Sequence, residues 1–230
     1  LREAMAAWEG DGHDAYIATD EQVGEVAVHV AEAASAATPL AGLRVVSVIA
    51  GDGVPAADVL AAAHRVALGS PARRSLFDLP LGDTPLWTVS ELPGGWGPPE
   101  SCGAVLPAWS ARSDHELDRP GYGMVAAADA ISQLLRLGNL PFAARQSAMA
   151  RFHRTGFEAA AVTALVQPGG APLEEPTVRR VAELRFAHPY AVVAVTSQWL
   201  IGPAGRRIAG PWHGLPVFSA WVAEVEEPDD

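Results

Sequence analysis

Hydrophobic residues in this chain gather in short runs or alternate with polar ones, a pattern typical of β-strands rather than of long helices. The clearest strand is Leu43–Ala50, a run rich in β-branched residues. Ala191–Val195 is apolar without interruption, so we expect a strand that is covered on both faces. Ser75–Leu81 and Pro85–Ser90 are predicted to form a hairpin-like pair of strands. Further strands are predicted at Val26–Val30, Val105–Trp109, Thr177–Phe186 and Leu215–Val222.

Helical patterns are fewer. Ala56–Val66 is rich in alanine and follows Pro55, which suits the first position of a helix. Ala127–Leu137 carries apolar residues at helical spacing and is followed by Gly138–Asn139, which would end it. Leu1–Tyr16 is expected to be a short helix or an irregular arm. Strands therefore dominate, and a few helices accompany them.

One stretch in the second half of the chain allows two interpretations. Ser147–His153 alternates as a strand does. Thr155–Glu158 spells a helix capping box, and Ala159–Ala161 are strong helix formers, so a plain helix is one interpretation. The other is a mobile segment that can join a sheet as an extra strand. Its side chains are small, no proline interrupts residues 142–167, and Gly156 supplies a pivot.

The run Gly156–Thr163 resembles the hinge of the reactive-centre loop of serpins. Four other stretches follow the order of that family. They are Ala104–Ser110, which looks like its "LPxF" strand; Asp118–Ala130, similar to the helix-containing link after it; Leu184–Val195, which resembles the "F.RPF" lead into a buried strand; and Leu215–Val222, which looks like its closing strand.

The resemblance implies an α+β, serpin-like multi-sheet fold, mostly antiparallel or mixed β with a few helices. We expect residues 1–230 to form a single domain, incomplete at its N-terminus because the early helices of the family have no counterpart in the sequence. The reactive-centre-loop region would be 154–178, and the family's spacing places the bait bond near Gly170–Ala171. The hinge would consist of Gly156, Phe157, Glu158, Ala159, Ala160, Ala161, Val162 and Thr163.

Serpins inhibit serine, and sometimes cysteine, proteases by offering this loop as bait and inserting it into a central sheet after cleavage. The resemblance thus implies a protease inhibitor and not an enzyme, with a serine protease or another protein as its partner. In an inserted strand, Phe157, Ala159, Ala161 and Thr163 would share one face. Phe157 stands where the family usually carries a small hydroxyl residue.

Two alternatives stay open. The first is a serpin-fold binding or scaffolding protein that has lost the trap. The second is a dinucleotide-dependent enzyme, because Leu43–Ala50, Gly51–Ala56 and the helix after them imitate a dinucleotide-binding fingerprint, with Asp78 near the spacing of a ribose-binding acid. A structural turn explains the glycines more simply, and Asp52 would place a negative charge beside a pyrophosphate.

Composition excludes several classes of function. The net charge of −11 argues against nucleic acid and anionic membranes as partners. All 16 basic residues are arginines, so lysine chemistry is excluded. Cys102 is the single cysteine and is expected to be a buried small hydrophobe. Asp114, Glu116 and Asp118 are expected to form a solvated loop. We therefore predict no cofactor and no metal, and favour a cytoplasmic protein over a secreted one.

Overall fold

A computed structural model of the chain describes residues 4–8, 13–35, 38–93, 98–119, 121–136, 143–153, 156–157 and 178–223. The protein is mostly β, and two α-helices occur in the part of the chain so described. Contacts divide it into two compact units, Leu1–Trp109 with Phe152–Asp230 and Ser110–Arg151.

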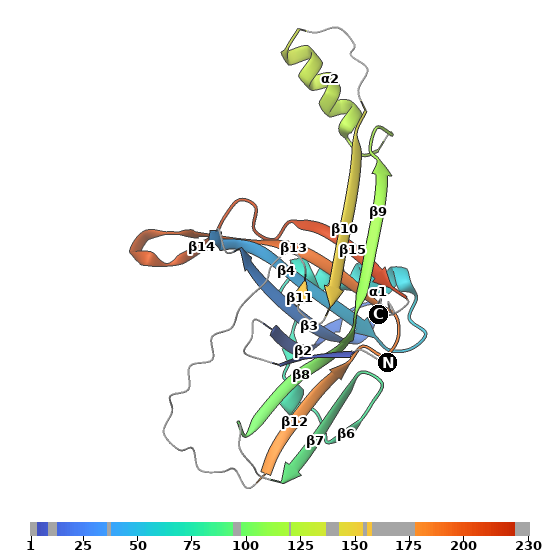
Figure 1. The fold of residues 1–230 in the computed structure, drawn as a ribbon, viewed down its shortest axis with the longest axis vertical. Coiled ribbons are helices and arrows are strands. Elements are labelled where there is room, and N and C mark those ends of the chain that lie inside the picture. The colour runs from blue at the N-terminus through green and yellow to red at the C-terminus, as the bar shows by residue number, and fades with distance from the viewer. Residues whose placement is uncertain are drawn as a thin grey trace. The chain divides into compact units, whose positions relative to one another are not determined.

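The largest sheet of the first unit has seven strands (Figure 1). Neighbouring strands run antiparallel throughout it. Apolar residues on alternate positions line its two faces, and the five residues Ala191–Val195 are each at most 1% exposed. The strand predicted there is confirmed, as is its burial on both faces. The strands are β14 (Arg207–Ala209), β13 (Tyr190–Ile201), β4 (Thr38–Ala50), β3 (Gly24–Ser35), β2 (His13–Asp20) and β5 (Arg73–Arg74), with β15 (Pro216–Val222) paired to β13.

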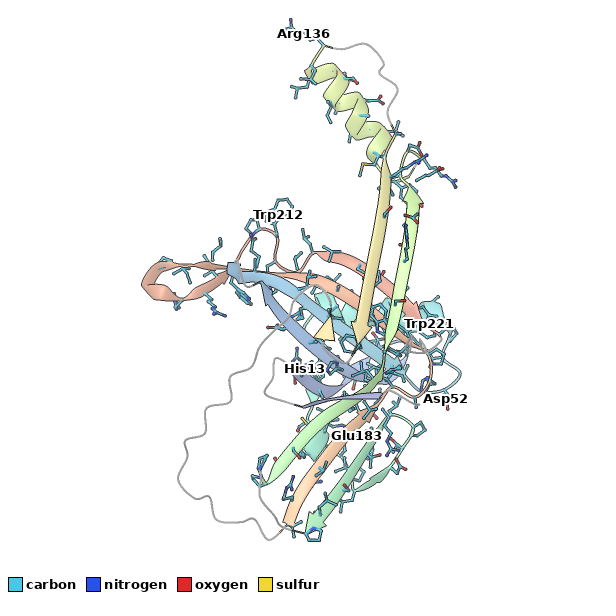
Figure 2. The ribbon with its side chains drawn as sticks, in the orientation of Figure 1. His13, Asp52, Arg136, Glu183, Trp212 and Trp221 are labelled. Atoms are coloured by element: carbon cyan, nitrogen blue, oxygen red, sulfur yellow. The ribbon has the colours of Figure 1, made fainter. Side chains whose placement is uncertain are left out.

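Helix α1 (Ala56–Leu68) covers one face of this sheet. It begins after Pro55, as predicted, and it buries a stripe of small and branched residues. Val59, Ala63 and Val66 pack with the valines of β3 and β4 into one core cluster, against which Trp221 is partly buried (Figure 2). Small residues on the helix let it approach the sheet closely, which explains why an alanine-rich sequence occupies this position.

A second sheet of the first unit contains β1 (Ala4–Trp8), β8 (Glu100–Pro107), β12 (Val178–Arg185), β7 (Trp87–Pro93) and β6 (Gly82–Asp83), in that order. Its strands pair antiparallel except β8 with β12, which are parallel. The sheet is therefore mixed. Leu106, Ala182 and Leu184 form its buried face, each fully or almost fully excluded from solvent.

A third sheet has the order β11-β10-β9. Its strands are β9 (Trp109–Glu116), β10 (Arg145–His153) and β11 (Gly156–Phe157). Helix α2 (Met124–Leu134) lies between β9 and β10 in the sequence, within the second unit. This helix confirms the predicted one in type, although it begins and ends three residues earlier than expected.

Three sequence predictions are corrected. Leu1–Tyr16 contains strand β1 and the start of β2 rather than a helix, because alanine-rich segments this short are decided by the sheet edge they meet. In Ser75–Leu81 the chain forms a 3-10 turn, Leu76–Asp78, instead of a strand. Strand β7 pairs with β6 instead. Strand β8 ends at Pro107 and β9 begins at Trp109. The predicted strand Val105–Trp109 is therefore divided between two strands.

Neither α1 nor α2 combines the length and the apolar character that a membrane-crossing helix needs, within the residues described here. Cys102 is buried at 4% exposure, as predicted for a small hydrophobe.

Candidate functional site

The end of strand β10 pairs with β11, the next described strand in the sequence. Phe152 pairs with Phe157 and His153 with Gly156 in an antiparallel register. Gly156 and Phe157 therefore form a strand on the edge of β10 that faces away from β9. Gly156 lies at the first position of that strand.

The structure describes the first two of the eight predicted hinge residues. Gly156 and Phe157 are extended, so the plain-helix interpretation is wrong for these two residues. Tertiary pairing with β10 overrides the local capping-box signal there. The remaining hinge residues, Glu158–Thr163, and the predicted bait residues Gly170 and Ala171 lie outside the described residues.

Three stacked aromatic rings anchor the end of β10. Phe152 is 4% exposed, and its ring lies 6.5 Å from that of Trp109, at an interplanar angle of 22°. On β15, Phe218 lies 6.2 Å from Trp109, with the two rings nearly parallel at 4°. Trp109 is itself 2% exposed. Stacks of this kind contribute about 0.5–1.5 kcal/mol per pair beyond the area they bury, so this end of β10 is held firmly.

Tyr190 at the start of β13 joins the same cluster. Its ring meets that of Phe186 edge to face at 4.9 Å. Burial raises the pKa of the Tyr190 phenol, and the neighbouring Trp109 side chain opposes this shift in part. Trp109 thus contacts three other strands: β10 through Phe152, β15 through Phe218 and β13 through Tyr190.

Three of the four strands that meet at Trp109 belong to stretches that resemble the serpin sequence. Trp109 belongs to the Ala104–Ser110 stretch, Tyr190 to Leu184–Val195 and Phe218 to Leu215–Val222, while Phe152 lies four residues before the hinge. Sequence reasoning identified these stretches separately. It did not show that they form one packed group, because their aromatic residues are up to 109 positions apart.

The dinucleotide fingerprint lacks the surroundings that such a site requires. The strand before it, β4, has antiparallel neighbours on both sides, whereas a dinucleotide site is built on parallel βα units. Asp52 is exposed and lies 3.6 Å from His188. Asp78 is part of the 3-10 turn. The glycines around Asp52 therefore act as a turn into α1, and Gly53 has a positive φ of 85° that favours glycine.

Of the three acidic residues predicted to form a solvated loop, Asp118 lies in a loop, and all three are exposed as predicted. Asp114 and Glu116 belong to β9 and not to a loop, and both are exposed. Ser147 donates a hydrogen bond to Asp114 across the strand pair, 2.5 Å long. Glu116 lies 3.6 Å from Arg119 and 3.9 Å from Arg145. Arginines thus compensate these carboxylates, and exposed pairs of this kind contribute little to stability.

The contact between His13 and His29 was not predicted from the sequence. His13 Nδ1 lies 3.1 Å from His29 Nε2, and the two rings stack at 5.2 Å. Burial lowers the pKa of His29 to about 3, and the charge of His13 adds to that effect. His29 is therefore neutral at pH 7. The two rings meet because β2 pairs with β3. This pairing was not predicted, since residues 1–16 were expected to be helical or irregular.

Asp20 forms a second structural centre in the β2–β3 turn. It accepts hydrogen bonds from the backbone amides of Gln22 and Val23 and a two-point contact from Arg65 of α1, at 2.7 and 2.9 Å. The Arg65 hydrogen bonds lower the pKa of the Asp20 carboxyl to about 2, against the opposing effect of burial. This contact joins α1 to the sheet.

No protein-family model matches this chain, and the search of curated proteins returned no match to it either.

Proposed function

We propose that this protein is a serpin-type inhibitor of a serine protease, in which the segment after His153 is cleaved and then extends along β10 as an added strand. The observation that carries the proposal is the chain reversal at β10, where Gly156 and Phe157 already occupy the edge that such a strand would use. The cluster around Trp109 supports it, because three of the serpin-like stretches meet there: Ala104–Ser110, Leu184–Val195 and Leu215–Val222.

The register of β11 defines the added strand residue by residue. Gly156 pairs with His153 and Phe157 with Phe152. Continued without a bulge, this register sets Ala161 opposite Ala148 and Ala164 opposite Arg145. Strand β10 has nine residues, so the alanine-rich run would cover its whole length.

The same register explains why the run consists of small residues. Positions directly opposite in a sheet share a face. Positions 157, 159, 161 and 163 therefore share the face of β10 that carries Ala150 and Phe152, which are 6% and 4% exposed. Position 157 falls opposite Phe152, at the aromatic end of the strand. A bulky residue is compatible with the proposal at this position, although the family usually has a small one.

On the other face, the register sets Glu158 opposite Arg151. Opposite charges on paired positions of a sheet stabilise it by roughly 0.2–1 kcal/mol. Each added ladder hydrogen bond contributes about 1 kcal/mol net. An inserted strand would therefore make the cleaved protein more stable than the intact one, as a kinetically trapped native state requires.

The proposal is tested by incubation with serine proteases and by thermal melting after cleavage. An inhibitor forms a covalent complex that survives denaturing electrophoresis, and its cleaved form melts at a higher temperature. Cleavage without complex and without stabilisation would contradict the proposal.

A second candidate is a binding protein that keeps the fold but not the trap. The exposure of α2 favours it: none of its described residues is buried, and Ile131 and Leu134 are 56% and 82% exposed. For such a protein, loop cleavage leaves the melting temperature unchanged or lowers it. Neither candidate assigns a catalytic residue, a cofactor or a metal to the chain.

A further inference from the structure

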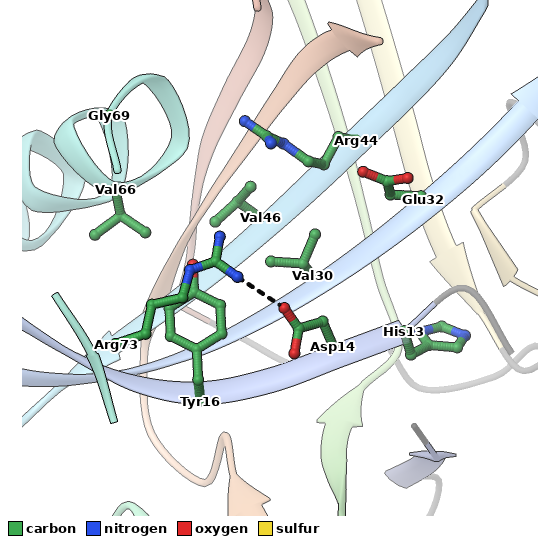
Figure 3. Close-up of a pocket in the computed structure, with 10 residues that line it drawn as sticks. All are labelled: His13, Asp14, Tyr16, Val30, Glu32, Arg44, Val46, Val66, Gly69 and Arg73. Atoms are coloured by element: carbon green, nitrogen blue, oxygen red, sulfur yellow. Dashed lines mark hydrogen bonds and ion pairs between the residues drawn. The ribbon is translucent and has the colours of Figure 1, made fainter. Parts of the chain in front are cut away.

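A pocket of about 300 Å³ opens between the C-terminal end of α1 and strands β2, β3 and β4 (Figure 3). It lies in the first unit, and none of its described lining residues belongs to the aromatic cluster. Its size is at the lower end of the range for small-molecule sites.

The floor of the pocket is apolar because alternate residues of the strands point to the α1 side. Val30 and Val46 are paired across β3 and β4 and are 7% and 2% exposed. Val66 of α1 and the ring of Tyr16 complete this floor, each 5% exposed. An apolar group placed here would be removed from water on several sides.

On one wall of the pocket, the positive charge of Arg73 is already compensated within the protein. Arg73 lies 3.0 Å from Asp14, and its guanidinium stands 4.2 Å from the centre of the Tyr16 ring (Figure 3). Arg73 thus has both an ionic and an aromatic partner. This wall contributes shape more than charge.

The other wall carries two opposite charges that do not neutralise each other. Glu32 and Arg44 are directly opposite in the β3–β4 register. Arg44 turns away and donates from Nη2 to the carbonyl of Ala67, 2.6 Å away, while its Nε is buried without an acceptor. Glu32 is exposed and makes no ion pair within the residues described. This wall therefore presents a carboxylate and a guanidinium that are not paired with each other.

We propose that the pocket binds a small zwitterion of the apolar amino-acid class. The ligand carboxylate accepts from Arg44, its ammonium group pairs with Glu32, and its apolar side chain covers Val30, Val46 and Val66. A simple carboxylate would meet the repulsion of Glu32, and a simple amine that of Arg44. A zwitterion satisfies both groups at once.

The test uses the full chain and measures thermal stabilisation and calorimetric binding of L-leucine, L-valine and L-phenylalanine. At least one of them is expected to raise the melting temperature in a saturable manner. The matched analogues of leucine are 4-methylpentanoate, which lacks the ammonium group, and isoamylamine, which lacks the carboxylate. We expect each to bind at least tenfold more weakly than the amino acid.

Glu32→Gln and Arg44→Gln are expected to weaken amino-acid binding at least tenfold, and Arg44→Lys less. Glu91→Gln removes the same charge from the second sheet and should leave binding unchanged. Arg44→Gln also removes a contact to α1, so Glu32→Gln is the variant that decides. Absence of binding by all three amino acids, equal binding of the analogues, or normal binding by Glu32→Gln would each overturn the proposal.

Discussion

Phe157 lies directly opposite Phe152 in the antiparallel pairing that follows the turn at the end of β10. The chain therefore uses the free edge of β10 as soon as it leaves that strand. An edge with unpaired backbone groups is a template for another strand. The proposed insertion requires only that the pairing already begun at Phe157 continue.

The two faces of the proposed strand are expected to tolerate charge differently. Ala161→Glu would place a carboxylate on the face of Ala150 and Phe152, where an unpaired charge is strongly destabilising. Ala160→Glu, one residue earlier, would place it on the opposite face. We expect cleavage to stabilise the wild-type protein and Ala160→Glu but not Ala161→Glu, measured by melting before and after proteolysis. Equal behaviour of the two variants would argue against a strand in this register.

Trp109 is expected to be the residue on which the aromatic cluster depends most. Trp109→Ala should lower the free energy of unfolding by about 3–5 kcal/mol, the usual cost of removing a buried large aromatic side chain. Trp212→Ala is the matched control, because Trp212 is 62% exposed and its loss should cost less than about 0.5 kcal/mol. Chemical denaturation measures both. A small effect at Trp109 would show that the stretches around it do not depend on this contact.

The Asp20–Arg65 contact predicts an effect of strong acid. The pKa of Asp20 is lowered to about 2 in the folded protein, from an ordinary value of 3.8. The ionised Asp20 carboxylate therefore stabilises the folded protein fully above pH 3.8, and this contribution is lost as the pH falls towards 2. Asp20→Asn should lower the free energy of unfolding at pH 7 by about 1 kcal/mol, because solvent around the partly exposed Arg65 screens the pair, and it should remove this pH dependence. Glu25→Gln, which breaks an exposed pair with Arg74, should cost less than about 1 kcal/mol.

His29 predicts a separate effect at milder pH. Its pKa is lowered from 6.5 to about 3, so the unfolded chain binds a proton in this range and the folded protein does not. Neutral His29 therefore costs the folded protein no stability above pH 6.5, and the free energy of unfolding declines as the pH falls from 6.5 towards 3. Denaturation curves at a series of pH values should show a flatter decline for His29→Gln. An unchanged slope would mean that His29 does not stay neutral.

Much of the fold was predictable because strand patterns dominate the sequence. The β-branched run of β4, the continuous apolar run of β13 and the alanine-rich helix α1 were predicted with the correct type. The strands at residues 4–8 and 13–16 were not predicted, because alanine favours helices locally and pairing with β8 and β3 makes these residues strands. Ser75–Leu81 was misassigned because its 3-10 turn is set by a Ser75 cap.

The candidate site was predictable in parts but not as a whole. The strand before Gly156, β10, was predicted from sequence, whereas the role of Gly156 as a pivot stays a prediction. The pairing of Phe157 with Phe152 was not, because Thr155–Glu158 locally favours a helix and register depends on the partner strand. The meeting of Trp109 with Phe152 and Phe218 is a property of the folded chain alone, and so is the pocket beside Arg44.

The most direct test of the account is disulfide formation between Ala148→Cys and Ala161→Cys in a Cys102→Ser background, before and after cleavage within residues 165–177. Opposite positions in a sheet bring Cβ atoms close enough to form a disulfide. We predict that the cross-link forms efficiently after cleavage, and that the shifted pair Ala148→Cys with Ala160→Cys does not form it. No cross-link after cleavage, or equal cross-linking of both pairs, would contradict the insertion of this segment along β10.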